Sequence, residues 1–444
     1  MIDRFTDGDE VRDLVGIGFG PSNLAVAVAL CEANNFKRAN VRFLERKAGF
    51  VWHEDMLLEG ARMQVSFLKD LATMRNPSSE FTFLTYLLKA GRLSKFANLK
   101  TFYPSRREFN DYMQWVAVQM GDMVQYHAHV TSVEPVADGS YVSLLRIHYT
   151  DDAGRQKSIL ARDVVFSTGP RPRMPFPLDK SLRLTAFHSN EFLSKLSHID
   201  VRDGSRFLVV GGGQSAAECA LYLYSTYEHA QVCLCTRGHT LRPMDDSCFV
   251  NEIFLPENID IWHRLDERTR TRLRNEYKYS NYACVDNDLL KKLYEILYEQ
   301  SVCAGHSRVQ VLTGTELVSA RQTGETINCS FRSVYEVCPI QNLDVEFIVF
   351  ATGYNLDLEP ALIAKLHRFL VHGDDGRLIC SRHYRIATTK DFLPKVFALG
   401  INEATHGIGD TLLSNMAVRA GEIVGALELE RKGPNNACAQ VRGS

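Results

Sequence analysis

Asp13-Leu-Val-Gly-Ile-Gly-Phe-Gly-Pro-Ser-Asn-Leu24 predicts a strand, a tight turn and a helix, the opening of a Rossmann-like dinucleotide-binding unit. Gly16 is expected to permit the turn, and Gly18 to let the backbone approach a pyrophosphate closely. Gly20 and Pro21 stand where the third glycine usually lies. Proline suits the first turn of a helix because its missing N–H would have no partner there. The helix N-terminus offers unpaired N–H groups and a positive dipole end to a phosphate.

A second strand, Val41-Arg-Phe-Leu-Glu45, follows the predicted helix. It ends in an acid 29 residues after Gly16, somewhat beyond the usual spacing of about 20. A carboxylate in this place accepts hydrogen bonds from a ribose diol, so Glu45 is the candidate for the adenosine ribose of FAD. The alternative is an exposed charge at the end of a strand.

A second glycine-rich turn lies 195 residues after the first, in Arg206-Phe-Leu-Val-Val-Gly-Gly-Gly-Gln-Ser-Ala-Ala-Glu218. Gly211, Gly213 and Ala216 complete the pattern G-x-G-x-x-A after an apolar strand. The strand that follows ends in Thr-Arg237 rather than in an acid. Because arginine pairs with a 2′-phosphate through charge-assisted hydrogen bonds, this unit is predicted to bind NADPH, with Arg237 as the selector. The alternative for Arg237 is a solvated side chain at a strand end.

Two apolar strands that end in Thr-Gly, Asp163–Gly169 and Glu346–Tyr354, bracket the second turn. They predict that the NADPH-binding unit is inserted into the FAD-binding unit, with the proline-rich Pro170–Pro177 as a stiff linker. The fold class is therefore α/β, with two Rossmann-like domains and a small, mostly helical substrate-binding region. The predicted boundaries are 1–190 and 341–435 for the FAD domain, 200–340 for the NADPH domain, about 245–300 for the helical region and 436–444 for a flexible tail.

Composition favours a soluble protein that acts on small molecules. The 444 residues are 45% hydrophobic and 23% charged, with a formal net charge of −2, and no stretch is apolar enough for a membrane span. No stripe of Lys and Arg predicts a nucleic-acid surface, and the charged run Asp266–Lys278 is expected to be a solvated helix face. The 11 cysteines include no C-x-x-C, and no His, Asp and Glu set has metal-ligand spacing. A cytoplasmic protein without a metal site is expected.

Several stretches together carry a resemblance that covers nearly the whole chain. They are Gly16–Leu24, Trp52-His53, Met63–Leu71, Arg75–Ser79, Phe102–Asn110, Gly211–Glu218, Phe249–Phe254, Ser280–Tyr282, Ala351–Tyr354 and Thr405–Ser414. In these stretches the chain resembles the microbial N-hydroxylating monooxygenases, specifically the L-ornithine N5-monooxygenases of hydroxamate siderophore biosynthesis. The resemblance implies FAD and NADPH as cofactors, L-ornithine and O2 as substrates, and a homo-oligomer, a tetramer as in that family.

The resemblance also implies a substrate site. Lys69 would bind the carboxylate of the amino acid, Asn251 its backbone end, and Asn281 its head or its side-chain amine. Ser414 would lie beside the isoalloxazine ring and the substrate. A zwitterion does need a cation for its carboxylate and amide oxygens for its ammonium group.

Most of the other matches fall on positions implied to bind the cofactors. Gln64 and Ser215 resemble the residues near the flavin and the bound NADP⁺, and with Asn281 they are the implied catalytic residues. The remaining implied cofactor-binding residues are Trp52, His53, Met63, Arg106, Gln214, Thr352, Gly353 and Leu413. For Trp52, Met63 and Arg106, the alternative is core packing or a surface charge.

The implied reaction is hydroxylation of the side-chain amine of L-ornithine to N5-hydroxy-L-ornithine. NADPH would reduce FAD, O2 would add to give a C4a-hydroperoxyflavin, and the neutral amine would attack its distal oxygen while NADP⁺ stays bound. One departure leaves the preferred amine open: the chain has Ser280-Asn-Tyr-Ala-Cys-Val-Asp286, where ornithine enzymes usually have Thr-Asn-Tyr-Ser-Val-Val-Asp.

The alternatives are therefore lysine or a diamine such as putrescine or cadaverine, because one methylene is worth only about 1–3 kcal/mol. The turn Gly-Phe-Gly-Pro-Ser-Asn and the presence of Lys69 favour ornithine. Two other classes share the same glycine-rich turns: an FAD-dependent NADPH oxidase or reductase that hydroxylates no amine, and a non-catalytic nucleotide-sensing protein.

Overall fold

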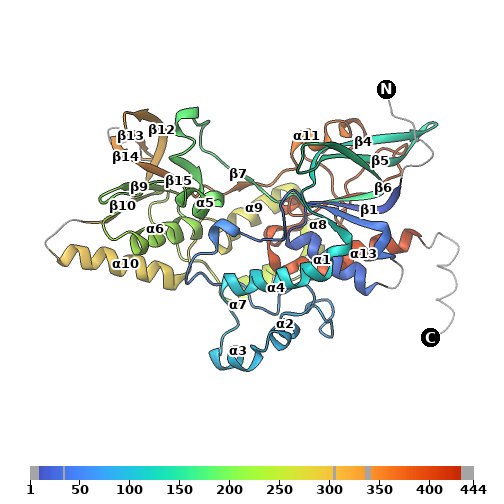
Figure 1. The fold of residues 1–444 in the computed structure, drawn as a ribbon, viewed down its shortest axis with the longest axis horizontal. Helices are drawn as coiled ribbons and strands as arrows, with labels where there is room; N and C mark the ends of the chain where they lie inside the picture. Colours follow the sequence, from blue (N-terminus) through green and yellow to red (C-terminus); the bar gives the residue numbers. More distant parts are fainter. Residues whose placement is uncertain (1–9, 34–35, 304–306, 336–341, 432–444) are drawn as a thin grey trace.

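Two sheets, each built around one of the glycine-rich turns, form two lobes of the molecule (Figure 1). The computed structural model describes residues 10–33, 36–303, 307–335 and 342–431. The predicted tail 436–444 lies outside the described residues. The predicted α/β class with two Rossmann-like units is confirmed, since each turn joins a buried parallel strand to a helix.

The first sheet contains the N-terminal glycine turn and has the strand order β3-β2-β1-β6-β5-β4, with β17 also beside β6. β1, β2, β3, β6 and β17 run parallel, and β4, β5 and β6 form an antiparallel meander. The strands are β1 (Val11–Ile17), β2 (Val41–Leu44), β3 (Val124–Gln125), β4 (His129–Asp138), β5 (Tyr141–Thr150), β6 (Gln156–Phe166) and β17 (Val396–Ala398).

Three helices pack together along one side of this sheet. α1 (Pro21–Glu32) begins at the predicted proline and is apolar along most of its length, so it is buried between α4 (Arg106–Gln119) and α13 (Met416–Arg431). Ser105 caps α4 by accepting a hydrogen bond from the backbone N–H of Glu108. The small helices α2 (Phe83–Lys89) and α3 (Leu93–Leu99) project below this layer (Figure 1).

The second sheet contains the other glycine turn, and all its strands are parallel in the order β11-β10-β9-β15-β8. Its central strands are almost entirely apolar, as expected for parallel strands that are covered on both faces. Cys233 and Cys235 are both buried on β10. The strands are β8 (Ala186–His188), β9 (Arg206–Val210), β10 (Gln231–Cys235), β11 (Val309–Leu312) and β15 (Phe347–Phe350).

Helices and a small sheet complete this second lobe. α6 (Gln214–Thr226) and α10 (Asn287–Val302) pack against each other beneath the parallel sheet (Figure 1). An antiparallel sheet of β12 (Thr315–Thr323), β13 (Thr326–Ser333) and β14 (Asn342–Val345) lies at the top of the lobe.

The two places where the chain crosses between the sheets lie side by side. β7 (Arg171–Pro172) and β16 (Tyr354–Asn355) pair antiparallel between the lobes. The predicted domain boundaries at 190 and 341 are therefore wrong for two strands, because β8 and β15 belong to the second sheet. The sequence shows only that Glu346–Gly353 is an apolar strand before a Thr-Gly turn. Which sheet it joins depends on its pairing with β9, a contact made across the insertion.

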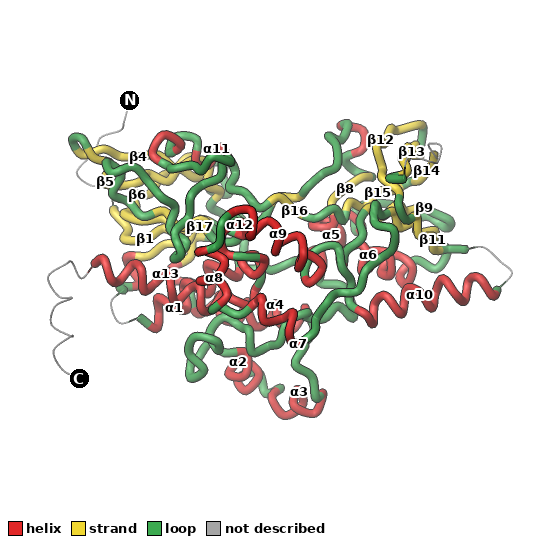
Figure 2. Tube along the Cα trace, turned by 180° about the vertical axis from the view of Figure 1, so that it is seen from behind, coloured by secondary structure: helices red, strands yellow, loops and turns green. Residues whose placement is uncertain are grey.

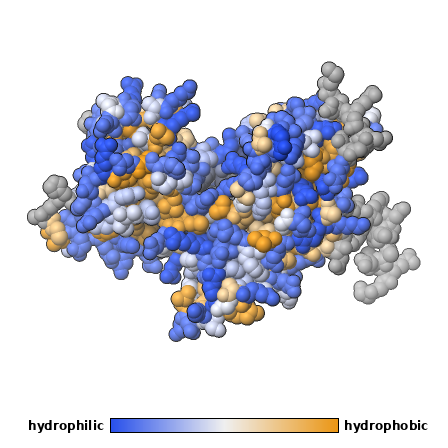
Figure 3. All heavy atoms as spheres, viewed as in Figure 1, coloured by the Kyte–Doolittle hydropathy of each residue, from blue (hydrophilic) through white to orange (hydrophobic). Residues whose placement is uncertain are grey.

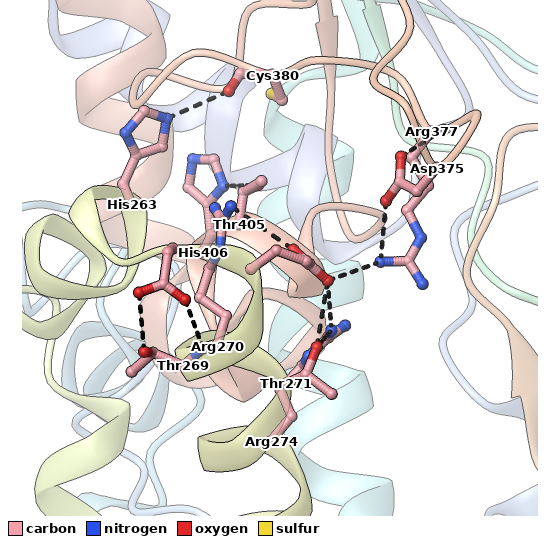
Figure 4. Close-up of polar contacts among 12 residues, drawn as sticks. His263, Thr269, Arg270, Thr271, Arg274, Asp375, Arg377, Cys380, Thr405 and His406 are labelled. Carbon is pink, nitrogen blue, oxygen red and sulfur yellow. Dashed lines mark hydrogen bonds and ion pairs between the residues drawn. The ribbon is translucent and has the colours of Figure 1, made fainter.

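A group of short helices lies between the two sheets (Figure 2). These are α7 (Cys248–Asn251), α8 (Asn258–Arg264), α9 (Glu267–Tyr277) and α12 (Glu403–His406), whereas α5 (Phe192–Leu196) packs against β8 and α11 (Pro360–Ile363) against β4. In Figure 4, His263 of α8 reaches the carbonyl oxygen of Cys380 at 3.2 Å, and Arg377 points to Glu267 of α9. The prediction that α9 presents a solvated face is only partly correct, because the side chains of Arg270 and Arg274 are just 17% and 19% exposed.

Each sheet has its own apolar core, which explains why the two lobes are distinct bodies. Phe19 and Phe43 contribute to the core under the first sheet, and Phe207 and Phe347 to the core under the second. Across residues 10–33, 36–303, 307–335 and 342–431, we find no helix with the length and apolar character that a bilayer crossing needs.

Candidate functional site

The first glycine turn is shaped by close packing of the backbone. Gly18 has φ +83°, and a Cβ there would lie 2.3 Å from the carbonyl oxygen of Ser167, so only glycine fits. Gly16, in contrast, lies within β1 and does not form the turn, which corrects the role predicted for it. A side chain at Gly16 would lie 2.2 Å from the ring of Phe43. Gly16 therefore lets this ring pack under the turn.

The space beyond the turn is open. Gly20 is the N-cap of α1, and a Cβ built on it would meet nothing within 4 Å. Pro21 follows as the first helical residue. The helix therefore presents an unobstructed N-terminus, which fits a pyrophosphate group.

Glu45 lies directly behind this turn and is not a solvated charge. Its side chain is only 9% exposed, and its carboxylate accepts hydrogen bonds from the backbone N–H groups of Phe19 at 2.7 Å and Lys47 at 2.9 Å. A carboxylate has about four acceptor positions, so two remain for a ligand. The position fits the ribose role, which stays a prediction.

The second turn repeats this design in the other lobe. A Cβ at Gly211 would lie 2.3 Å from the carbonyl oxygen of Ala351 and 3.2 Å from Cβ of Ala216, which accounts for the small residue at the third position. Gly213 caps α6, so Gln214 and Ser215 occupy its first two positions. These two side chains therefore stand at a helix N-terminus of the kind that binds phosphate.

Arg237 follows β10 and is open to solvent. Its side chain is 73% exposed, and its only described ion pair is a loose one with Glu316 at 3.7 Å. The guanidinium is thus free to bind an anion, and its selection of NADPH stays a prediction.

Three residues that were predicted to bind a cofactor lie in the segment between β2 and α4. The backbone N–H of Trp52 donates to Oδ1 of Asn110 at 2.8 Å, and its ring packs edge-on against His53 with centroids 4.7 Å apart. His53 has φ +50°, a left-handed conformation that is uncommon for residues other than glycine. Met63 is buried in the core of the first lobe.

Arg106 joins the two lobes. Its guanidinium donates to the carboxylate of Glu218 through Nη2 at 2.8 Å and Nη1 at 3.0 Å, and Nη1 also donates to the carbonyl oxygen of Met56. Both side chains are buried, so the alternative of a surface charge is excluded. The pair connects α4 to α6, and a direct contact of Arg106 with a cofactor stays a prediction.

Other predicted cofactor residues lie at the crossing point and in the C-terminal part. Thr352 and Gly353 follow β15, and the carbonyl oxygen of Gly353 accepts from the N–H of Arg173 at 2.9 Å. Leu413 and Ser414 lie in a single 3₁₀ turn before α13, where Ser414 is buried.

The three predicted substrate residues come from three separate segments. Lys69 lies in the loop before α2, Asn251 ends α7, and Asn281 follows the 3₁₀ turn Lys278–Ser280. Asn251 Nδ2 donates to the carbonyl oxygen of Asp246 at 2.8 Å, which leaves its amide oxygen available.

Lys69 is the most informative of the three. It is half-buried, and the removal of water lowers the pKa of its ammonium group. Among the residues that the structure describes, no carboxylate pairs with it. A partly desolvated ammonium without a protein anion is suited to the carboxylate of a small ligand.

The structure adds residues that were not singled out from the sequence. One of them is Asp286, which accepts hydrogen bonds from Gln64 and Gln214, two predicted residues in different lobes. Tyr282 donates to Glu403 across 2.5 Å, which joins the Asn281 segment to α12. The sequence did contain a signal for Glu218, because a residue four positions after Gln214 lies on the same face of the predicted helix. For Asp286 the sequence showed only its place before a helix and its match to the last residue of the motif Ser280–Asp286.

Comparison with known proteins decides the family. The family model of L-lysine 6-monooxygenase/L-ornithine 5-monooxygenase matches residues 10–356. This chain belongs to that family. One curated relative, an L-ornithine N(5)-monooxygenase of Burkholderia cepacia, is 39% identical over 406 residues, which cover 90% of each chain.

Solved structures of the family have the same fold. An ornithine N-hydroxylase of Kutzneria sp. 744, determined with reduced FAD, NADP⁺ and L-ornithine, superimposes with a TM-score of 0.90 at 35% identity, over 95% of this chain and 100% of the other. An L-lysine 6-monooxygenase of Pseudomonas syringae has a TM-score of 0.83 at 31% identity, over 94% and 99% of the two chains. The chain is thus a flavin-dependent monooxygenase by family.

Proposed function

We propose that this protein uses FAD, NADPH and O2 to hydroxylate the side-chain amine of L-ornithine, giving N5-hydroxy-L-ornithine for hydroxamate siderophore biosynthesis. The observation that carries the proposal is Lys69, a half-buried lysine with no carboxylate partner among the described residues. A simple NADPH oxidase would need both glycine turns but would have no use for such a group.

The residues at the two turns have separate tasks in this proposal. Gly18, Gly20 and Glu45 would hold the pyrophosphate and ribose of FAD, and Gln214, Ser215 and Arg237 would hold NADPH. Bound flavin supplies the activation of oxygen, which no side chain can provide. The protein positions the amine and excludes water, which limits the release of peroxide.

Lys69, Asn251 and Asn281 would orient the amino acid. The ammonium group of Lys69 would bind its carboxylate, and the amide oxygen of Asn251 is available for its α-ammonium group. The amine that reacts must lose its proton first, because an ammonium nitrogen has no lone pair.

Lysine and diamines remain the alternative substrates. The ornithine enzymes described above are 35% and 39% identical to this chain, and the lysine enzyme 31%. A diamine has no carboxylate and would leave Lys69 without a role. Mass spectrometry of the products formed from ornithine, lysine, putrescine and cadaverine separates these possibilities.

Substituting Lys69→Met tests the proposal. We expect the KM for ornithine to rise about 10- to 100-fold, because a hydrogen bond to a charged group contributes about 1.5–3 kcal/mol. Reduction of the bound flavin by NADPH should continue. Lys89→Met, at the exposed end of α2, is the matched control. It should change neither the KM for ornithine nor the reduction of the flavin by NADPH. An unchanged KM in Lys69→Met, or wild-type protein that forms peroxide but no hydroxylamine, would contradict the proposal.

A cytoplasmic location and a homo-oligomeric state also remain proposals. The free state of all nine described cysteines supports a reducing compartment. Exposed apolar side chains on and beside α2 and α3, which include Leu88, Leu99 and Phe102, support a subunit contact. They gather on the lower projection in Figure 3. Light scattering of the purified protein measures the oligomeric state.

A further inference from the structure

Three segments that are far apart in the sequence meet at the carboxylate of Asp286. Gln64 Nε2 donates to its Oδ1 at 3.1 Å, and Gln214 Nε2 donates to its Oδ2 at 3.1 Å. The amide oxygen of Gln214 in turn accepts from the backbone N–H of Asp286 at 2.9 Å. One carboxylate therefore joins the loop after β2, the first turn of α6 and the start of α10.

The network continues from Gln214 toward the first lobe. Gln214 Nε2 also lies 3.0 Å from Oε1 of Glu218, the partner of Arg106. The same segment covers the second glycine turn, because a Cβ at Gly213 would lie 3.6 Å from Cα of Ala283. Ala283 has φ +54°, a strained conformation for an alanine that is held by its surroundings.

Asp286 does not serve the purpose that its position suggests. It is the N-cap of α10, where an aspartate normally accepts a hydrogen bond from the first turn of its helix. Its side chain makes no cap hydrogen bond. Both of its oxygens instead bind side-chain amides from outside α10.

The contact also fixes how the amide of Gln64 is oriented. Only the NH2 end of an amide can donate to a carboxylate, so the amide oxygen must point away from Asp286. The side chain of Gln64 is otherwise exposed, and no other strong hydrogen bond holds it among the described residues. Without Asp286 the amide could rotate, and its donor and acceptor would exchange places.

We propose that Asp286 is a positioning residue that orients Gln64 toward the flavin and Gln214 toward the nicotinamide nucleotide, and so couples the two lobes during flavin reduction. The inference rests on the proposed function only in its assignment of the two cofactors. It requires an ionised carboxylate, because a protonated one has a single good acceptor oxygen for the two amides.

The surroundings make this ionisation sensitive to pH. Burial raises the pKa of Asp286 above its usual value, and the charges of Glu218 on α6 and Asp246 before α7 raise it further, while the two amides lower it. The guanidinium group of Arg106 reaches Asp286 only through Glu218. The thiol of Cys284 lies in the same segment as Asp286. As the pH falls through this raised pKa, the carboxylate gains a proton and releases one amide.

Substituting Asp286→Asn tests the inference, because asparagine matches the protonated carboxyl in shape and in having one acceptor oxygen. The measurement is the rate of flavin reduction by saturating NADPH without oxygen, followed in FAD-loaded enzyme between about pH 5 and 8. We expect the wild-type rate to fall on acidification. Asp286→Asn should be slower by about tenfold or more at the upper end, and its rate should not vary with pH.

Two further variants separate positioning from folding. Asp288→Asn, an exposed residue on the first turn of the same helix, should keep the wild-type rate and pH profile. Asp286→Glu, which retains the charge, should restore the pH dependence. The inference would be overturned if Asp286→Asn showed the wild-type pH profile of flavin reduction. It would also be overturned if flavin reduction in Asp286→Glu were slow at every pH. Since flavin reduction needs no amine, a failure of amine hydroxylation in the wild-type enzyme would be seen separately.

Discussion

Arg237 is the residue on which the choice between NADPH and NADH is predicted to depend. Its guanidinium is exposed and only loosely paired, so it is available to a 2′-phosphate. Arg237→Ala should raise the KM for NADPH about 10- to 100-fold and leave the KM for NADH unchanged, as expected for the loss of a charge-assisted hydrogen bond. Steady-state kinetics with both nucleotides measures this. Arg321→Ala, an exposed arginine of β12, is the control, and equal effects on both nucleotides would refute the assignment.

At the scale of single residues, the sequence predicts positions better than partners. Glu45 and Arg106 were singled out from the sequence, but their burial and their bonds to Phe19 and Glu218 follow from packing. Gly16 was assigned to the turn, although it makes room for a ring on the neighbouring strand. Gln64 and Asp286 are separated by 222 positions, so no local pattern reveals their contact.

At the scale of elements, Gly407 holds α8 against α12. It has φ +83°, and a Cβ there would lie 2.9 Å from the indole of Trp262 on α8. Gly407→Ala should therefore cost about 1–3 kcal/mol, because this backbone region admits almost only glycine. Urea unfolding monitored by fluorescence measures the change.

Gly425→Ala is the matched control for Gly407→Ala. It lies in α13 with nothing within 4 Å of a new Cβ, so the substitution should be neutral or slightly stabilising. If the two variants unfold at the same urea concentration, the packing of Trp262 against Gly407 contributes nothing to stability.

The strands and helices at the glycine turns could be predicted because sterics and periodicity act locally. The strand before each turn, the helix after it and the strand that follows all lie where the pattern placed them. The sheet to which β8 and β15 belong could not be predicted. Both are short; β15 pairs with β9 across the inserted segment, and β8 pairs only with β15. The helical region was located, but its docking through His263 and Arg377 depends on a distant loop (Figure 4).

At the scale of the whole molecule, the buried pair Arg106–Glu218 connects the lobes. Removing either partner leaves an uncompensated buried charge, so Arg106→Met and Glu218→Met should each cost about 3–5 kcal/mol. The double variant should be less destabilised than the sum of the single ones, because neither charge is then stranded. Thermal unfolding of all four proteins forms the thermodynamic cycle.

The exposed pair Arg202–Asp200, at 3.1 Å, is the control for that cycle. Both side chains are more than two-thirds exposed, so Arg202→Ala should cost less than about 1 kcal/mol. Strict additivity at Arg106 and Glu218 would show that the lobes do not depend on this ion pair.

The pairing of β7 with β16 has a consequence for how such a protein can be assembled from parts. The chain leaves the first lobe and returns to it through two adjacent antiparallel segments, so the ends of the intervening stretch are neighbours in space. A piece with adjacent ends can be excised and replaced by a tight loop, or transplanted into another host, without disturbing the strand order of its surroundings. Exchange of the nucleotide-binding unit would therefore keep the strand order of the first sheet, but it would also replace Glu218 and Asp286, the partners of Arg106 and Gln64 in the first lobe.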